Sequence, residues 1–146
     1  MLEALDAAIG AADFEQTFTS GSAFDKFDIV AIASDGFVDA ATVAVTAHGT
    51  TGCALSVVGI AMVAATGAAE PIAVTTVPGA VITDDNTQGW AFDEGDEVFL
   101  STGGQLVDQD NVTVTAGQAV VKIGVCIDAT ATANKILFQP EFRFIN

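Results

Sequence analysis

The chain has 146 residues, of which 4 are basic and 19 acidic, so its formal net charge is −15. This length corresponds to one domain, and a hydrophobic share of 51% is enough to build a core. A field of carboxylates repels phosphate groups, which excludes direct nucleic-acid binding and docking on an anionic membrane. The longest apolar run, residues 57–69, is too short and too rich in Ala and Gly to cross a membrane.

The acidity has two explanations that can hold together. Halophilic proteins use such a composition, because concentrated salt screens the self-repulsion that would otherwise destabilise the fold. An acidic surface also keeps a protein soluble and non-sticky at very high local copy number. The first six residues carry acids where a secretory signal carries Lys or Arg, so we expect a protein made and used without Sec export. We expect Cys53 and Cys126 to be free and buried rather than joined in a disulfide.

Residues 1–24 differ in pattern from the rest of the chain. Leucine and isoleucine recur there at spacings of three and four residues, and two phenylalanines follow in a polar stretch. This pattern predicts a short amphipathic turn followed by an extended arm, with a β domain over residues 25–146. The apolar side chains of the predicted arm are Leu2, Leu5, Ile9, Phe14 and Phe18.

From residue 28 onward the pattern is typical of strands, with runs of branched or aromatic residues bounded by Gly, Pro, Asp or Asn. The runs are 28–33, 42–46, 56–61, 71–75, 98–100, 112–115, 119–126 and 136–145. In the last run Ile136, Phe138, Phe142 and Phe144 share one face, and the other face carries Lys135, Gln139, Glu141 and Arg143. Pro140 marks an edge or a bend. No convincing segment with a helical period follows the first dozen residues, so the predicted fold class is all-β.

An internal repeat indicates how these strands are organised. Three pairs of segments match in order: 28–32 with 96–100, 57–60 with 122–125, and 72–74 with 136–138. Gly36 then aligns with Gly104, and Gly59 with Gly124. Two copies of one strand unit would bury their faces against each other. The sequence therefore predicts a small β-barrel or β-sandwich with an internal two-fold repeat.

Catalytic motifs are missing from the sequence. His48 is the only histidine, and no nucleophile elbow, zinc-protease or phosphate-loop motif occurs. A nucleophile pair of His48 with Cys53 is far less expected than a loop histidine beside a partly buried thiol. We therefore expect no enzyme, no cofactor and no dedicated metal site.

The densest group of carboxylates lies between residues 84 and 97. A weak cation site there would use Asp84, Asp85, Asp93 and Asp96, although their spacing fits no EF-hand loop. A solvated acidic loop that collects counterions loosely is the more expected interpretation. Trp90 and Phe92 lie within this segment and suggest a subunit interface, with packing at one end of the domain as an equal alternative.

Several segments carry a family likeness when taken in order. They are Phe27–Ile32 with Asp35-Gly36, Val58–Ala61, Glu70–Val74, Gly95–Gly104, Val121–Val125 and Ile136–Pro140. This ordered set resembles small head decoration or capsid cement proteins of tailed viruses, of bacteria or of haloarchaea. The likeness covers approximately residues 22 to 140, and Gly95–Gly104 is its most specific part.

The resemblance implies a non-enzymatic virion protein on the outer surface of an expanded icosahedral capsid. Such proteins commonly form trimers that bridge neighbouring subunits of the major capsid protein and resist the pressure of packaged DNA. An N-terminal arm often adds a strand to a capsid sheet, a role that residues 1–24 would take here. A trimer of so acidic a chain needs contacts that are apolar or screened by salt.

Two other functions remain open from the sequence. A receptor- or carbohydrate-binding module of a tail or fibre would use an aromatic platform such as Trp90 with nearby acids. A metal-dependent enzyme or hydrolase is the least expected, because one histidine and no recognisable nucleophile leave little catalytic machinery.

Overall fold

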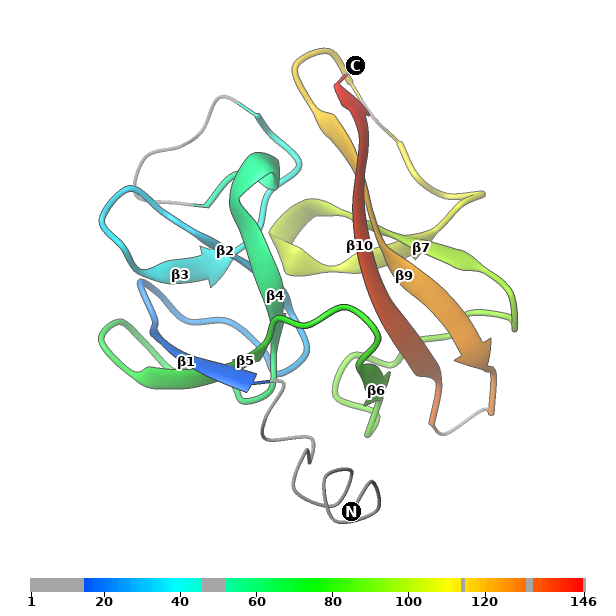
Figure 1. The fold of residues 1–146 in the computed structure, drawn as a ribbon, viewed down its shortest axis with the longest axis horizontal. Coiled ribbons are helices and arrows are strands. Elements are labelled where there is room, and N and C mark those ends of the chain that lie inside the picture. Colours follow the sequence, from blue (N-terminus) through cyan, green and yellow to red (C-terminus); the bar gives the residue numbers. More distant parts are fainter. Residues whose placement is uncertain (1–14, 46–51, 114, 131–132, 146) are drawn as a thin grey trace, which may run out of the picture.

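The computed structural model describes residues 15–45, 52–113, 115–130 and 133–145. These residues form ten strands in two five-stranded antiparallel sheets, which Figure 1 shows side by side. Within the described residues the only helical elements are the 3₁₀ turns η2 (Ala54–Ser56) and η3 (Thr102–Gly104). The prediction of an all-β fold is confirmed, and the arrangement is sandwich-like rather than a closed barrel.

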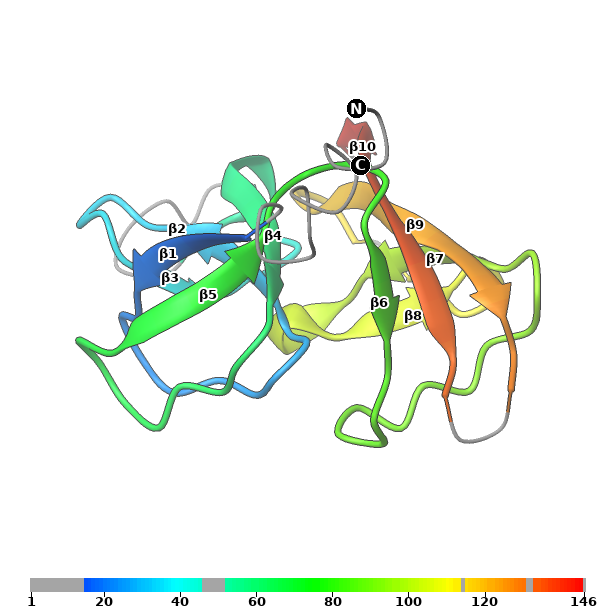
Figure 2. The same ribbon diagram turned by 60° about the horizontal axis from the view of Figure 1, so that its bottom comes forward.

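Each sheet is built from consecutive strands of the chain, as the second view of the ribbon makes clear (Figure 2). The first sheet has the order β1-β5-β4-β2-β3 and contains β1 (Glu15–Thr19), β2 (Ile29–Ile32), β3 (Val38–Ala40), β4 (Val57–Ala61) and β5 (Pro71–Thr75). The second has the order β6-β10-β9-β7-β8 and contains β6 (Val81–Thr83), β7 (Glu97–Leu100), β8 (Leu106–Asp108), β9 (Ala119–Asp128) and β10 (Lys135–Ile145).

The two strand orders are identical once every strand number is raised by five, which confirms the internal repeat. The agreement extends to single residues: Val30 of β2 pairs with Gly59, and Val98 of β7 pairs with Gly124. Both pairings continue into a register shift at the next residue of the first strand. The two repeats, whose sequences are only weakly similar, therefore share one strand topology. They also share a register shift at the same position, between β2 and β4 and between β7 and β9.

The predicted alignment of the third pair of repeat segments, 72–74 with 136–138, is wrong by two residues. In the structure Val74 of β5 pairs with Ala61, and the equivalent contact of β10 is between Ile136 and Cys126. Val74 therefore corresponds to Ile136 rather than to Phe138. A shift of two residues keeps every side chain on the same sheet face, so the hydrophobic pattern could not reveal the error.

Gly59 and Gly124 are equivalent positions at which the neighbouring strand leaves no room for a side chain. A Cβ atom at Gly59 would lie 2.0 Å from the Thr75 carbonyl oxygen, and one at Gly124 would lie 2.1 Å from the Leu137 carbonyl oxygen. Each glycine thus lets the closing strand of its repeat approach the central strand.

The molecule has a shared core and a smaller core within the first repeat. The shared core joins both sheets, with Ile29 and Ile60 from the first and Ile123 and Ile136 from the second. The smaller core lies on the other face of the first sheet, around Val30. Equivalent faces of the two repeats are therefore used differently, because the counterpart of Val30, Val98, lies in the shared core.

Six of the eight predicted runs contain a strand, whereas the described parts of the other two do not, and several short strands were not predicted. The three-residue strands β3, β6 and β8 are missing from the predicted set, because so few residues show no readable alternation. Residues 42–46 and 112–115 are not strands in their described parts. Val43 instead lies buried in a connecting segment, where its carbonyl accepts the N–H of Ala119 at 2.8 Å. Pro140 lies at a register shift between β9 and β10, as the bend prediction required.

The predicted N-terminal arm is wrong for residues 15–24. Residues 15–19 form β1, which pairs along its whole length with β5. Phe18 packs against the smaller core, and Phe24 is buried in it with 6% of its surface exposed. Strand pairing overrides the polar composition on which the prediction rested. Leu2, Leu5, Ile9 and Phe14 lie outside the described residues.

Candidate interaction surface

Asp28 joins the two repeats at a buried position. Its Oδ1 accepts hydrogen bonds from the side-chain amides of Gln88 at 2.8 Å and Gln105 at 2.9 Å, both from the second repeat. Its Oδ2 accepts the backbone N–H of Asp25 at 3.0 Å. Burial raises the pKa of the Asp28 carboxyl above its ordinary value of 3.8, although the hydrogen bonds oppose the shift.

The second repeat contains the counterpart of this turn. The Asp93 N–H donates to Oδ2 of Asp96 at 2.9 Å, as Asp25 does to Asp28. Gln109 donates to Oδ1 of Asp96 at 3.0 Å. These bonds lower the pKa of the exposed Asp96 carboxyl, and the Gln109 side chain is the largest cause. Asp93 and Asp96 thus shape a turn that leads into β7.

Asp84 and Asp85 bind different groups. Asp84 is buried and accepts the backbone N–H of Trp90 at 2.9 Å, whereas exposed Asp85 forms an ion pair with Lys26 at 2.7 Å. Hydrogen bonding from Lys26 and Thr87 lowers the pKa of Asp85 to about 2. Across the part of the chain that the structure describes, no group of three or more His, Cys, Asp or Glu side chains is placed to hold a metal ion.

Trp90 packs inside the molecule rather than on its surface. Only 9% of the residue is exposed, and its ring lies 5.7 Å from the ring of Phe27 in the shared core. The structure therefore agrees with the packing alternative, and leaves little of the indole for a subunit contact or a carbohydrate platform. Phe92 is half-buried, and its N–H donates to Asn134 at 2.8 Å.

The two cysteines are free and buried, as expected from the sequence. Burial raises the pKa of the Cys126 thiol, and neighbouring carboxylates add to the shift. A thiol with a raised pKa holds little of the nucleophilic thiolate form at neutral pH. His48, the partner considered for Cys53, lies outside the described residues.

The most prominent exposed apolar feature is the end of β10, which sequence reasoning assigned to a half-buried strand. Phe142, Phe144 and Ile145 are 47%, 55% and 53% exposed. β10 continues to Ile145, whereas its counterpart β5 ends at Thr75, the equivalent of Leu137. In the sequence, the only sign of this extension is that the predicted run 136–145 is longer than its counterpart 71–75.

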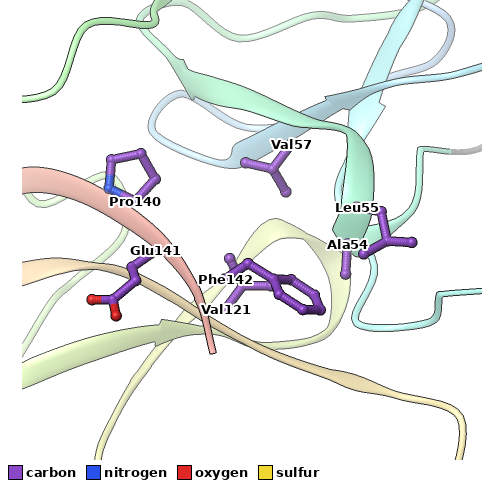
Figure 3. Close-up of a pocket in the computed structure, with 7 residues that line it drawn as sticks. All are labelled: Ala54, Leu55, Val57, Val121, Pro140, Glu141 and Phe142. Carbon is purple, nitrogen blue, oxygen red and sulfur yellow. The ribbon is translucent and has the colours of Figure 1, made fainter. Parts of the chain in front are cut away.

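A groove runs beside this extension, between the two repeats. It has a volume of about 210 Å³ and is lined by Ala54, Leu55, Val57, Val121, Pro140, Glu141 and Phe142. Figure 3 shows the ring of Phe142 on β10 and the side chains of Ala54 and Leu55 on the facing η2 turn. Leu55 is 57% exposed, so its side chain adds to the apolar surface.

No protein-family model matches the chain, and no curated protein is significantly similar to it. Among the described residues, no helix is long and apolar enough to span a membrane.

Proposed function

We propose that this protein is a structural component of a tailed-virus particle and binds the outer surface of the expanded capsid. In this role it bridges neighbouring major capsid subunits as a homotrimer, the assembly that the resemblance implies. It works by avidity, through many shallow contacts repeated over the shell.

The observation that carries this proposal is the coincidence of the resembling segments with the framework of the fold. Residues 27–32 and 95–104 contain β2 and β7, and residues 58–61 and 121–125 lie in β4 and β9. The resemblance thus follows the repeated architecture in both copies rather than a single short motif. The exposed apolar end of β10 supports the same proposal, since surfaces of this kind mark protein contacts.

The described polar groups also support a structural role. The buried carboxylates Asp28 and Asp84 hold loops and connect the repeats, and Asp96 shapes a turn. The described carboxylates singled out from the sequence thus take part in folding contacts.

Binding to shells tests the proposal directly. Expanded capsids that lack this protein are mixed with the purified chain, and the bound fraction is measured by co-sedimentation. We expect saturable binding to expanded shells and weak binding to unexpanded precursors. Absence of saturable binding to either form would refute the proposal.

The proposed role of the N-terminal arm in capsid binding can be tested with a truncation that leaves every described strand intact. Deleting residues 1–20 would remove β1, whereas deleting residues 1–14 keeps every described strand. If the arm binds the capsid, the shorter deletion keeps the circular dichroism spectrum of the full chain but loses shell binding. Full binding by this variant would refute the role of the arm.

A further inference from the structure

The last part of β10 has a free backbone edge. β6 pairs only with residues 135–137 of β10, and the adjacent carbonyl and N–H of Phe138 bind Gly79 and Ala80. Beyond this point β9 is the only described strand that pairs with β10. The opposite edge over residues 139–145 is therefore unpaired in the described chain. It contains Pro140 and two register shifts, between Phe138 and Glu141 and between Phe142 and Phe144, so its pairing with β9 is regular only at Glu141 and Phe142 before the second shift. The unpaired backbone groups around these two residues can accept another strand.

Apolar side chains gather around this edge. Eight large hydrophobic residues of the described chain are exposed, and three of them lie on this part of β10: Phe142, Phe144 and Ile145. Leu55, a fourth, lines the groove together with Phe142. The groove between the repeats continues this surface. A free strand edge with exposed aromatic residues is an association surface unless charge or bulk blocks it.

Four charged side chains near the edge, two acidic and two basic, form a network with no net charge. Glu97 accepts Lys122 at 3.2 Å and Arg143 at 3.3 Å, and Arg143 also pairs with Glu141 at 3.5 Å. Two of the four basic residues of the chain thus lie in one neutral network. For a chain with net charge −15, this is a place where two copies can approach with little repulsion.

The order of side chains along the edge is self-complementary. Glu141 and Arg143 flank Phe142, so an antiparallel copy centred on Phe142 places each Glu141 opposite the Arg143 of the other copy. It also places the two Phe142 residues opposite each other. A register centred on Arg143 would instead set two arginines face to face, which is unfavourable.

We propose that β10 pairs with β10 of a second copy across a two-fold axis at Phe142, joining the second sheets of the two copies into one ten-stranded sheet. Backbone hydrogen bonds provide the affinity, and the two Glu141–Arg143 pairs set the register. The contact is isologous, since both copies use the same surface. It does not depend on the proposed capsid function; on a shell it would connect neighbouring trimers.

Sedimentation equilibrium of the purified full-length chain tests the pairing, with three charge variants. Glu141→Arg and Arg143→Glu each put like charges opposite each other twice per dimer, so each should weaken dimerisation about tenfold or more. The double variant Glu141→Arg/Arg143→Glu restores opposite charges and should regain affinity close to that of the unchanged chain. Urea midpoints of all three variants check that the fold is kept, because Arg143 also contacts Glu97.

A matched pair of phenylalanines tests the apolar part of the contact. Phe142→Ser should weaken dimerisation, whereas Phe37→Ser, at a residue 39% exposed in the first repeat, should leave it unchanged. A chain that stays monomeric, or that forms only trimers, would overturn the proposal. So would a dimer in which the double variant is no tighter than the two single ones. Shell binding is measured separately, so either proposal can fail alone.

Discussion

Gly124→Ala should lower the stability of the fold strongly, although it adds only one methyl group. The added methyl group would lie 2.1 Å from the Leu137 carbonyl oxygen and 3.1 Å from a side-chain carbon of Ile136. The oxygen belongs to the backbone of β10, so the strand itself must move by about 1 Å. Overpacking of this kind costs about 3 kcal/mol. Gly59→Ala should cost a similar amount, because its Cβ would meet the Thr75 carbonyl oxygen at 2.0 Å.

Urea denaturation followed by circular dichroism measures this effect. With a slope of about 1.5 kcal/mol per molar urea, the midpoint should fall by about 2 M. Gly67→Ala is the matched control, because a Cβ there has nothing within 4 Å and should change stability by less than about 1 kcal/mol. Equal midpoints for Gly124→Ala and Gly67→Ala would refute the close approach of β9 and β10, and with it the equivalence of the repeats.

Three further predictions concern single side chains. Trp90→Ala should destabilise the fold by about 3–5 kcal/mol in the same urea assay, against less than about 0.5 kcal/mol for exposed Phe37→Ala; similar small losses would contradict the burial of Trp90. Because the folded-state pKa of Asp28 is raised above 3.8, the stability of the unchanged chain relative to Asp28→Asn should be greatest below pH 3.8 and decline as pH rises through the raised pKa; denaturation at several pH values would show the opposite slope if the carboxyl favoured its charged form. Lys26→Gln should move the pKa of Asp85 from about 2 toward 3.8, and an unchanged carboxyl NMR titration would argue against the ion pair.

The all-β fold class could be predicted from the sequence because the inner strands are long enough to show a strand-like residue pattern. β2, β4, β5, β7, β9 and β10 each combine branched or aromatic residues with flanking turn residues. Gly59 and Gly124 revealed the repeat, since the same close backbone approach requires glycine in both copies. β1 was not predicted, because its residues are mostly polar and its strand conformation depends on pairing with β5.

The surface was harder to predict than the core. Alternation along β10 placed Phe138 and Phe142 on one face, but only Phe138 is covered. Which part of a long strand is covered depends on the extent of its neighbours, and β6 pairs with β10 only over residues 135–137. For Trp90 the sequence left a subunit interface and packing at one end of the domain equally open, and in the structure the ring packs on Phe27. Long-range packing decides both cases.

Quantitative mass spectrometry of purified virus particles tests the proposed function most directly. The measured quantity is the copy number of this chain relative to the major capsid protein in the same particles. The proposal predicts comparable copy numbers, since a decoration protein covers the whole shell. A handful of copies per particle would contradict shell decoration and indicate a tail or fibre component, and absence from particles would contradict any role in the virion.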